Sequence, residues 1–165
     1  MSTAHDPFPS VRHDHRACVD NALHDAETLC AEQGLRLTPI RRRVLELIWQ
    51  GHRPRGAYEI LEQLAADGHR PSPPTVYRAL EFLVEHRLVH RVNSRNAFVG
   101  CAHPGDPHAA QIFICDCCGV AVEQSDGTLQ RRILRNAQGL HFQVREQTVE
   151  IAGVCPRCAE RQHEA

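Results

Sequence analysis

Apolar residues in the first hundred positions follow a helical period in two segments. They recur at i, i+4, i+7 and i+8, as Ile40, Val44, Leu47 and Ile48 in the first segment and as Val76, Leu80, Leu83 and Val84 in the second. Such a stripe predicts an amphipathic helix with one buried face. Thr38-Pro39 and Ser72-Pro73 precede the stripes and supply an N-cap hydroxyl and a first-turn proline. We therefore predict two capped helices that begin near residues 39 and 73.

The surrounding pattern predicts the rest of a first domain. Segments 14–33 and 57–66 have further helical periodicity, and segments 88–92 and 97–99 alternate around a polar turn at 93–96, which predicts a hairpin. Helices followed by a hairpin indicate a winged helix-turn-helix over residues 14–102, after an arm at 1–13 that we expect to be disordered. The fourth helix would enter the major groove of DNA.

A Pro- and Gly-containing segment at 103–107 predicts a hinge before a second domain at 108–165. In that domain we expect strands at 111–115, 120–124 and 142–151, and a helix at 128–138. The predicted fold class is therefore α+β. A domain of this size has room for only a small core, so we expect a metal and a partner subunit to contribute to its stability.

Two Cys-x-x-Cys motifs in this domain supply four thiols, Cys115, Cys118, Cys155 and Cys158. Four thiolates form a closed tetrahedral zinc site, which leaves no position for a substrate and is therefore structural. Two disulfides or a redox dithiol are the alternatives. They are disfavoured because redox motifs usually occur singly, on a thioredoxin-like pattern that this chain lacks.

The charge distribution favours a nucleic-acid partner for the first domain. Residues 36–100 carry 11 arginines and 6 acidic residues, whereas the whole chain has a formal net charge of −1. All 19 basic residues are arginine, which suits phosphate and guanine contacts but is also expected from a GC-rich genome. The chain shows no signal-like or membrane-spanning apolar segment, so we expect a cytoplasmic protein with reduced cysteines. No nucleophile–base pair or phosphate loop is evident, so we do not expect an enzyme.

Four motifs carry a resemblance to a known family: Leu35–Arg42, Pro74–Leu80, Phe113–Gly119 and Glu150–Cys158. They resemble the ferric uptake regulator family of bacterial metal-responsive repressors, most closely its zinc-sensing branch, and the resemblance extends over about residues 15–160. The resemblance implies a winged-helix DNA-binding domain and a metal-stapled dimerisation domain. It also implies a homodimer that binds palindromic operator DNA and represses zinc uptake genes when a second zinc ion is bound.

The same resemblance implies a regulatory zinc site formed by His90, Cys101, His108 and Glu123. The spacings of 11 residues from His90 to Cys101 and seven from His108 to Cys115 agree with zinc-sensing relatives. A set with one thiolate favours tetrahedral Zn²⁺ over a harder iron ion. Each residue also has an ordinary structural explanation. An iron or manganese sensor, or a zinc-handling adaptor that does not bind DNA, remains the alternative function. The four cysteines and these four residues form two separate ligand sets, so we expect two zinc ions per subunit, one structural and one regulatory.

For DNA contacts we single out Tyr58, Tyr77 and Arg78, with Arg41 and Arg43 as candidates for phosphate binding. Tyr77 and Arg78 lie outside the apolar stripe of the fourth helix, and an arginine there can bind the O6 and N7 atoms of guanine. Tyr77 could instead be a core residue.

Overall fold

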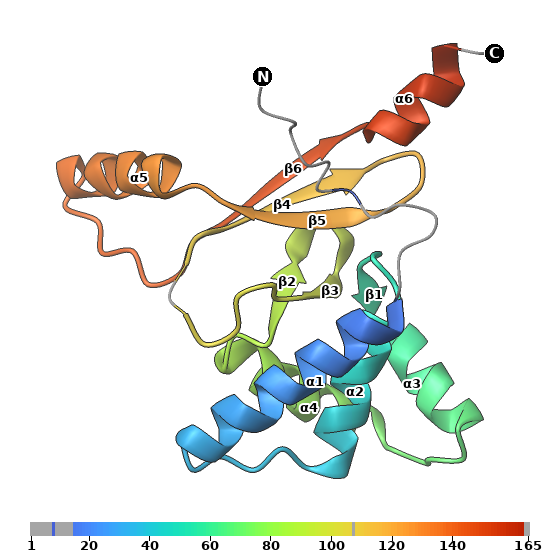
Figure 1. Cartoon of the computed structure of the whole chain (residues 1–165). Helices are drawn as coiled ribbons and strands as arrows, with labels where there is room; N and C mark the ends of the chain where they lie inside the picture. The colour runs from blue at the N-terminus through green and yellow to red at the C-terminus, as the bar shows by residue number, and fades with distance from the viewer. Residues whose placement is uncertain (1–7, 9–14, 107, 164–165) are drawn as a thin grey trace. The chain divides into compact units, whose positions relative to one another are not determined.

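The computed structural model describes residues 8, 15–106 and 108–163, and it divides into two compact units, Met1–Asp106 and Pro107–Ala165 (Figure 1). Apart from Phe8, the predicted arm at 1–13 lies outside the described residues, as does position 107 of the predicted hinge. Each unit has its own sheet. The mixed helix-and-strand content confirms the predicted α+β class.

Within its described residues, the first unit holds four helices and a small sheet. In chain order its elements are α1 (His15–Glu32), α2 (Pro39–Trp49), β1 (Arg55–Gly56), α3 (Ala57–Ala66), α4 (Pro73–Glu85), β2 (Val89–Val92), a 3₁₀ turn (Asn93–Arg95) and β3 (Ala97–Gly100). Both predicted stripes face the core. Six of their eight residues are buried, and Ile40 and Val84 are half-buried against the same core.

The helix starts in this unit follow the local sequence. The Thr38 hydroxyl accepts a hydrogen bond from the Arg41 N–H at 3.5 Å, so Thr38 is the predicted N-cap of α2. At the start of α3 the Glu59 carboxylate accepts from the Gly56 N–H at 3.0 Å. Pro73 occupies the first position of α4, where its missing N–H breaks no helical hydrogen bond.

The hairpin β2–β3 forms the wing, and β1 completes its sheet in the order β1-β3-β2. The strand β1 was not predicted, because its two residues become a strand only by pairing with Phe98 and Ala97. Asn96 turns the hairpin in a left-handed conformation with φ 47°. Gly100 ends β3 against the indole of Trp49, which leaves no room for a Cβ atom.

The second unit has a three-stranded sheet in the order β5-β4-β6, with a helix before the third strand and another after it. Its elements are β4 (Ala110–Cys115), β5 (Ala121–Ser125), α5 (Gly127–Gly139), β6 (Thr148–Gly153) and α6 (Pro156–His163). Strand β4 pairs antiparallel with β5 and parallel with β6. Its large buried aliphatic side chains are few, namely Ile112, Ile114 and Val120.

One prediction for this unit was wrong in part, and one helix was missed. The strand expected at 142–151 begins only at Thr148, because the Phe142 N–H caps α5 by donating to the Ala137 carbonyl at 2.9 Å. His141 reaches this turn with φ 53°, and the Phe142 side chain is 66% exposed. Helix α6 was not predicted, although Pro156 stands at its first position. Among the described residues, no helix is long and apolar enough to cross a membrane.

Candidate metal sites and nucleic-acid interface

The four predicted thiols of the second unit come together. Cys115 ends β4 and Cys118 follows in the next turn, while Cys155 and Cys158 lie at the start of α6. Their sulfur atoms all lie within 4.8 Å of one another, and the Sγ atoms of Cys118 and Cys155 are 3.7 Å apart. Zinc–sulfur bonds of about 2.3 Å in a tetrahedron require sulfur atoms roughly 3.8 Å apart. All eight cysteines are free thiols, so this cluster fits a metal ion rather than two disulfides.

Backbone donors favour an anionic sulfur at Cys115 in this cluster. Burial raises the pKa of the Cys115 thiol, but N–H groups of Cys155, Cys118 and Cys117 outweigh burial and lower this pKa to about 6. One of these donors, the Cys155 N–H, lies 3.3 Å from the Cys115 sulfur. Burial instead raises the pKa of Cys155 to about 12. A bound cation is what would allow all four groups to be thiolates together.

Helix α6 adds two cations that sequence reasoning missed. Arg157 donates to the Cys118 sulfur at 3.9 Å and Arg161 to the Cys158 sulfur at 3.7 Å. They lie four residues apart, on one face of the helix, and a four-thiolate zinc site carries net negative charge. Cys117 is exposed, accepts from the Gln162 side chain at 3.3 Å and does not belong to the group of four thiols.

The second set of candidate ligands divides between the two units. In the second unit, His108 precedes β4 and Glu123 lies on β5 opposite Ile112. The His108 Nε2 and Glu123 Oε1 atoms are 2.5 Å apart, and the two side chains are only 9% and 4% exposed. A buried imidazole and carboxylate in contact supply one nitrogen and one oxygen ligand for a metal ion.

The other half of the set belongs to the wing of the first unit. His90 lies on β2 opposite Val99. Cys101 directly follows β3, is 3% exposed, and donates its N–H to the Leu88 carbonyl at 3.1 Å. The base of the hairpin therefore fixes the backbone at both positions. The whole set of two imidazoles, one thiolate and one carboxylate matches the ligand types that zinc accepts.

Three of the residues predicted to contact DNA are exposed on the helix-turn-helix. Tyr58 lies in the first turn of α3 and is 70% exposed, and Tyr77 on α4 is 42% exposed. The exposure of Tyr77 argues against its alternative as a core residue. Arg78 is exposed beside it, and its guanidinium has no ion-pair partner among residues 15–106 and 108–163. These side chains are available to an external ligand.

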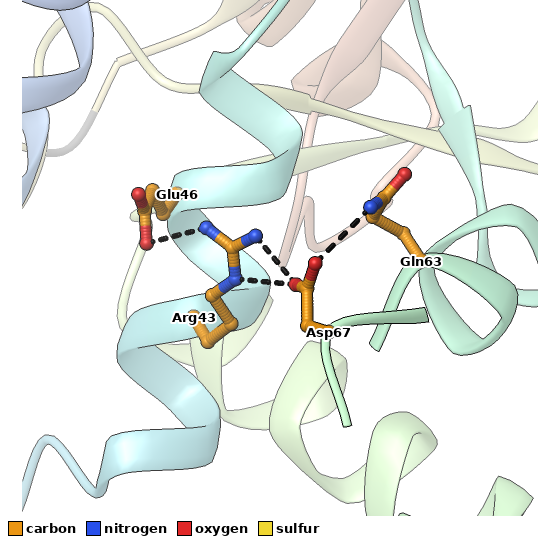
Figure 2. Close-up of polar contacts among 4 residues, drawn as sticks. All are labelled: Arg43, Glu46, Gln63 and Asp67. Atoms are coloured by element: carbon orange, nitrogen blue, oxygen red, sulfur yellow. Dashed lines mark hydrogen bonds and ion pairs between the residues drawn. The ribbon is translucent and has the colours of Figure 1, made fainter. Parts of the chain in front are cut away.

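The two arginines predicted to bind phosphate have partners within the first unit. Arg41 donates to the Arg36 carbonyl at 2.7 Å, and its guanidinium carbon lies 3.6 Å from the centre of the Phe82 ring on α4. Arg43 contacts the carboxylates of Glu46 and Asp67 (Figure 2). The Nε, Nη1 and Nη2 atoms of Arg43 are all engaged within the protein, which favours a structural role for this side chain. Arg41 uses only its Nη1 atom in a hydrogen bond, so its predicted phosphate contact stays a prediction.

These features define a winged-helix protein whose second domain is built around a four-thiol metal centre. Residues 32–152 match the ferric uptake regulator family model, and the chain belongs to that family. The zinc uptake regulation protein of Escherichia coli (strain K12) is 37% identical over 146 residues, which span 88% of this chain and 85% of the relative. The peroxide-responsive repressor PerR of Staphylococcus aureus (strain Mu50 / ATCC 700699) is 26% identical over 144 residues, 87% of this chain and 95% of the relative.

Two solved structures resemble most of the chain. One is the holo form of XcZur, with 42% identity and a TM-score of 0.80 over 86% of this chain and 99% of that chain. The other is a zinc uptake regulator complexed with zinc and DNA, with 36% identity and a TM-score of 0.83 over 88% of this chain and 97% of that chain. The expectation that the chain is not an enzyme agrees with its membership in a family of regulators.

Proposed function

We propose that this protein is a zinc-responsive transcriptional repressor that binds palindromic operator DNA as a homodimer and controls zinc uptake genes. The observation that carries the proposal is the similarity, over nearly the whole chain, to a zinc uptake regulator complexed with zinc and DNA. The exposed Tyr77 and Arg78 on the second helix of a helix-turn-helix agree with it. As a bacterial-type DNA regulator, the protein would act in the cytoplasm.

The four cysteines of the second unit would hold one zinc ion permanently. Cys115 and Cys118 belong to one segment, and Cys155 and Cys158 to another that follows β6. They link the C-terminal ends of β4 and β6, the two parallel strands of the sheet. Since every ligand is supplied by the protein, the site has a structural role and no catalytic one.

His90, Cys101, His108 and Glu123 would hold the regulatory zinc ion. Zinc supplies a tetrahedral centre that accepts nitrogen, sulfur and oxygen ligands together. His90 and Cys101 come from the wing unit, while His108 and Glu123 come from the second unit. A zinc ion bound by ligands from both units would limit the bending of the connecting segment 103–107. It would thereby restrict the orientations available to the DNA-binding helices. The Cys101 thiolate would disfavour iron(II) and manganese(II), which prefer harder ligands.

A partner subunit is expected on the second unit. Helix α5 has a single buried residue, Ala137, whereas Leu134, Leu140 and Phe142 on and after it are 39%, 78% and 66% exposed. So much exposed apolar surface on a small unit is typical of an interface. A two-fold dimer would present two α4 helices and therefore requires two symmetric half-sites in the DNA.

The proposal is tested by measuring DNA affinity against free zinc for wild type and Cys101→Ser. The probe is a duplex selected from random sequence by the zinc-loaded wild-type protein. We expect the DNA affinity of wild type to rise by about 5- to 150-fold when zinc is added, the usual range of coupling between two sites. Cys101→Ser should keep one zinc per subunit and lose this response. An identical zinc dependence in both proteins would show that the regulatory ligands are placed wrongly, and wild type that selects no duplex would refute the function.

A further inference from the structure

Arg43 of α2 connects two parts of the helix-turn-helix in a way that the sequence did not reveal (Figure 2). Its Nε and Nη2 atoms donate to one oxygen of Asp67 at 2.9 and 2.5 Å, and its Nη1 atom lies 2.9 Å from Glu46. The second oxygen of Asp67 accepts from the Gln63 side chain at 3.2 Å. The side chains of Arg43 and Asp67 are 24% and 23% exposed, so water screens this pair in part.

The position of Asp67 is unusual for a carboxylate. Asp67 is the C-cap of α3, where the helix dipole disfavours negative charge. The chain then turns through Gly68, which has φ 86°, and the His69 N–H donates to the Leu64 carbonyl at 3.0 Å. Arg43 compensates the unfavourable charge, and the pKa of Asp67 is lowered, chiefly by its hydrogen bond from Arg43. Segment 67–72 leads into the N-terminus of α4, and its first residue, Asp67, is thereby attached to α2.

We propose that Arg43 is a positioning residue for DNA recognition: through Asp67 it fixes the turn at 67–72 and with it the start of helix α4. This inference rests on the proposed DNA-binding function. It replaces the predicted phosphate contact of Arg43, since the same guanidinium would act inside the protein and touch no DNA.

A directional contact is needed here because the buried face of α4 restrains the helix only in part. Val76, Leu80 and Leu83 hold it by apolar packing, which depends little on direction. Charge-assisted hydrogen bonds have defined distances and angles. Base contacts by Tyr77 and Arg78, in the first turns of α4, depend on placement within about half an ångström. The core should therefore keep α4 folded without the ion pair, while the accuracy of its N-terminal end is lost.

The two roles of Arg43 predict opposite signs for one substitution. If Arg43 binds phosphate, Asp67→Asn frees it and removes a negative charge, so DNA affinity should rise. If Arg43 positions the turn, Asp67→Asn should lower affinity. We therefore compare wild type with Arg43→Gln, Asp67→Asn and the double variant, all zinc-loaded and full length. The probes are the duplex selected by wild type and a random-sequence duplex, each at several salt concentrations. Arg42→Gln is the matched control, since Arg42 is exposed on the same helix and pairs with Glu27 at 3.0 Å.

We expect each single variant to lose at least about threefold in affinity for the selected duplex, and the double variant to lose no more than the worse single one, as for two coupled residues. Binding of the random duplex and the slope of affinity against salt should stay at the wild-type values. Arg42→Gln should keep the preference for the selected duplex.

Several results would overturn the proposal. One such result is an Asp67→Asn protein that binds the selected duplex as tightly as wild type or more tightly. Another is a slope of log affinity against log salt concentration that falls by about 0.9 per subunit in Arg43→Gln, the signature of one lost phosphate contact. An equal loss of preference in Arg42→Gln would also do so. These outcomes leave the repressor function intact, because wild type still binds. Wild type that binds no selected duplex would instead overturn both proposals.

Discussion

Loss of one thiol from the four-cysteine centre should unfold the second unit and leave the first unit folded. The change that we choose is Cys155→Ser. It preserves the Cys155 backbone N–H, which donates to the Cys115 sulfur, and it removes a sulfur 3.7 Å from that of Cys118. A serine hydroxyl is nearly the size of the thiol but is not a ligand of structural zinc sites, so the substitution tests the metal rather than the packing.

The magnitude follows from how little else holds this unit. Its three large buried aliphatic side chains, Ile112, Ile114 and Val120, contribute about 1.5–3 kcal/mol each. A structural zinc ion contributes about 10–16 kcal/mol in small zinc domains, more than the three side chains together. By contrast, the described buried cluster that runs through α1, α2, α3, α4 and the wing lies wholly in the first unit. The zinc centre therefore decides whether the second unit is folded.

The assay combines zinc content per subunit with amide hydrogen exchange. In Cys155→Ser we expect loss of the chelator-resistant zinc and rapid exchange in β4, β5 and β6, while α2 and α4 stay protected. Cys117→Ser is the matched control, because Cys117 lies within the first Cys-x-x-Cys motif but its sulfur accepts a hydrogen bond from Gln162. It should keep its zinc and its protection. A zinc-free Cys155→Ser protein with a protected second unit would refute the reasoning, as would equal damage in both variants.

Two further substitutions test the first unit. Arg78→Ala should lose about 1–3 kcal/mol of discrimination per half-site while the fold and the zinc content are kept; binding to the selected and random duplexes checks this, and an unchanged preference would remove Arg78 from base recognition. Gly100→Ala would place a Cβ atom 2.1 Å from the Cε2 atom of Trp49. The wing should then shift and the first unit lose about 1–3 kcal/mol, as for other overpacked sites; urea unfolding followed by Trp49 fluorescence measures it, and wild-type stability would contradict the predicted clash.

The elements that sequence alone predicted are those whose signals are local. Helices α2 and α4 have a proline and a buried stripe within about 12 residues, and each begins at the predicted proline. The Thr38 hydroxyl caps α2 as predicted, but the Ser72 hydroxyl makes no capping hydrogen bond to α4 and instead lies 3.0 Å from the Thr75 hydroxyl. Strand β1 has no such signal, because its two residues become a strand only by pairing with residues some 40 positions later. The start of β6 was misplaced for a related reason: Phe142 looks like a strand residue, but its N–H is used to end α5.

The same division applies to the candidate sites. The spacing of the two Cys-x-x-Cys motifs is a local signal, and it was sufficient to predict which four thiols meet. The residues proposed as regulatory ligands have no such spacing of their own, and their role was inferred from the family resemblance. Arg157 and Arg161 were missed because nothing in the segment Pro156–His163 indicated a helix that would aim them at the thiols.

The arginines differ in ways that their contribution to net charge does not reveal. Arg41, Arg43 and Arg78 contribute equally to the basic character of residues 36–100, yet the structure engages the first two within the protein and leaves Arg78 exposed. One local clue did exist for Arg43. An aspartate at the C-terminus of α3 is unfavourable with respect to the helix dipole, so a nearby cation stabilises it. An acidic residue at the end of a helix-turn-helix's first helix is therefore a reason to expect that one nearby arginine is structural rather than a DNA contact.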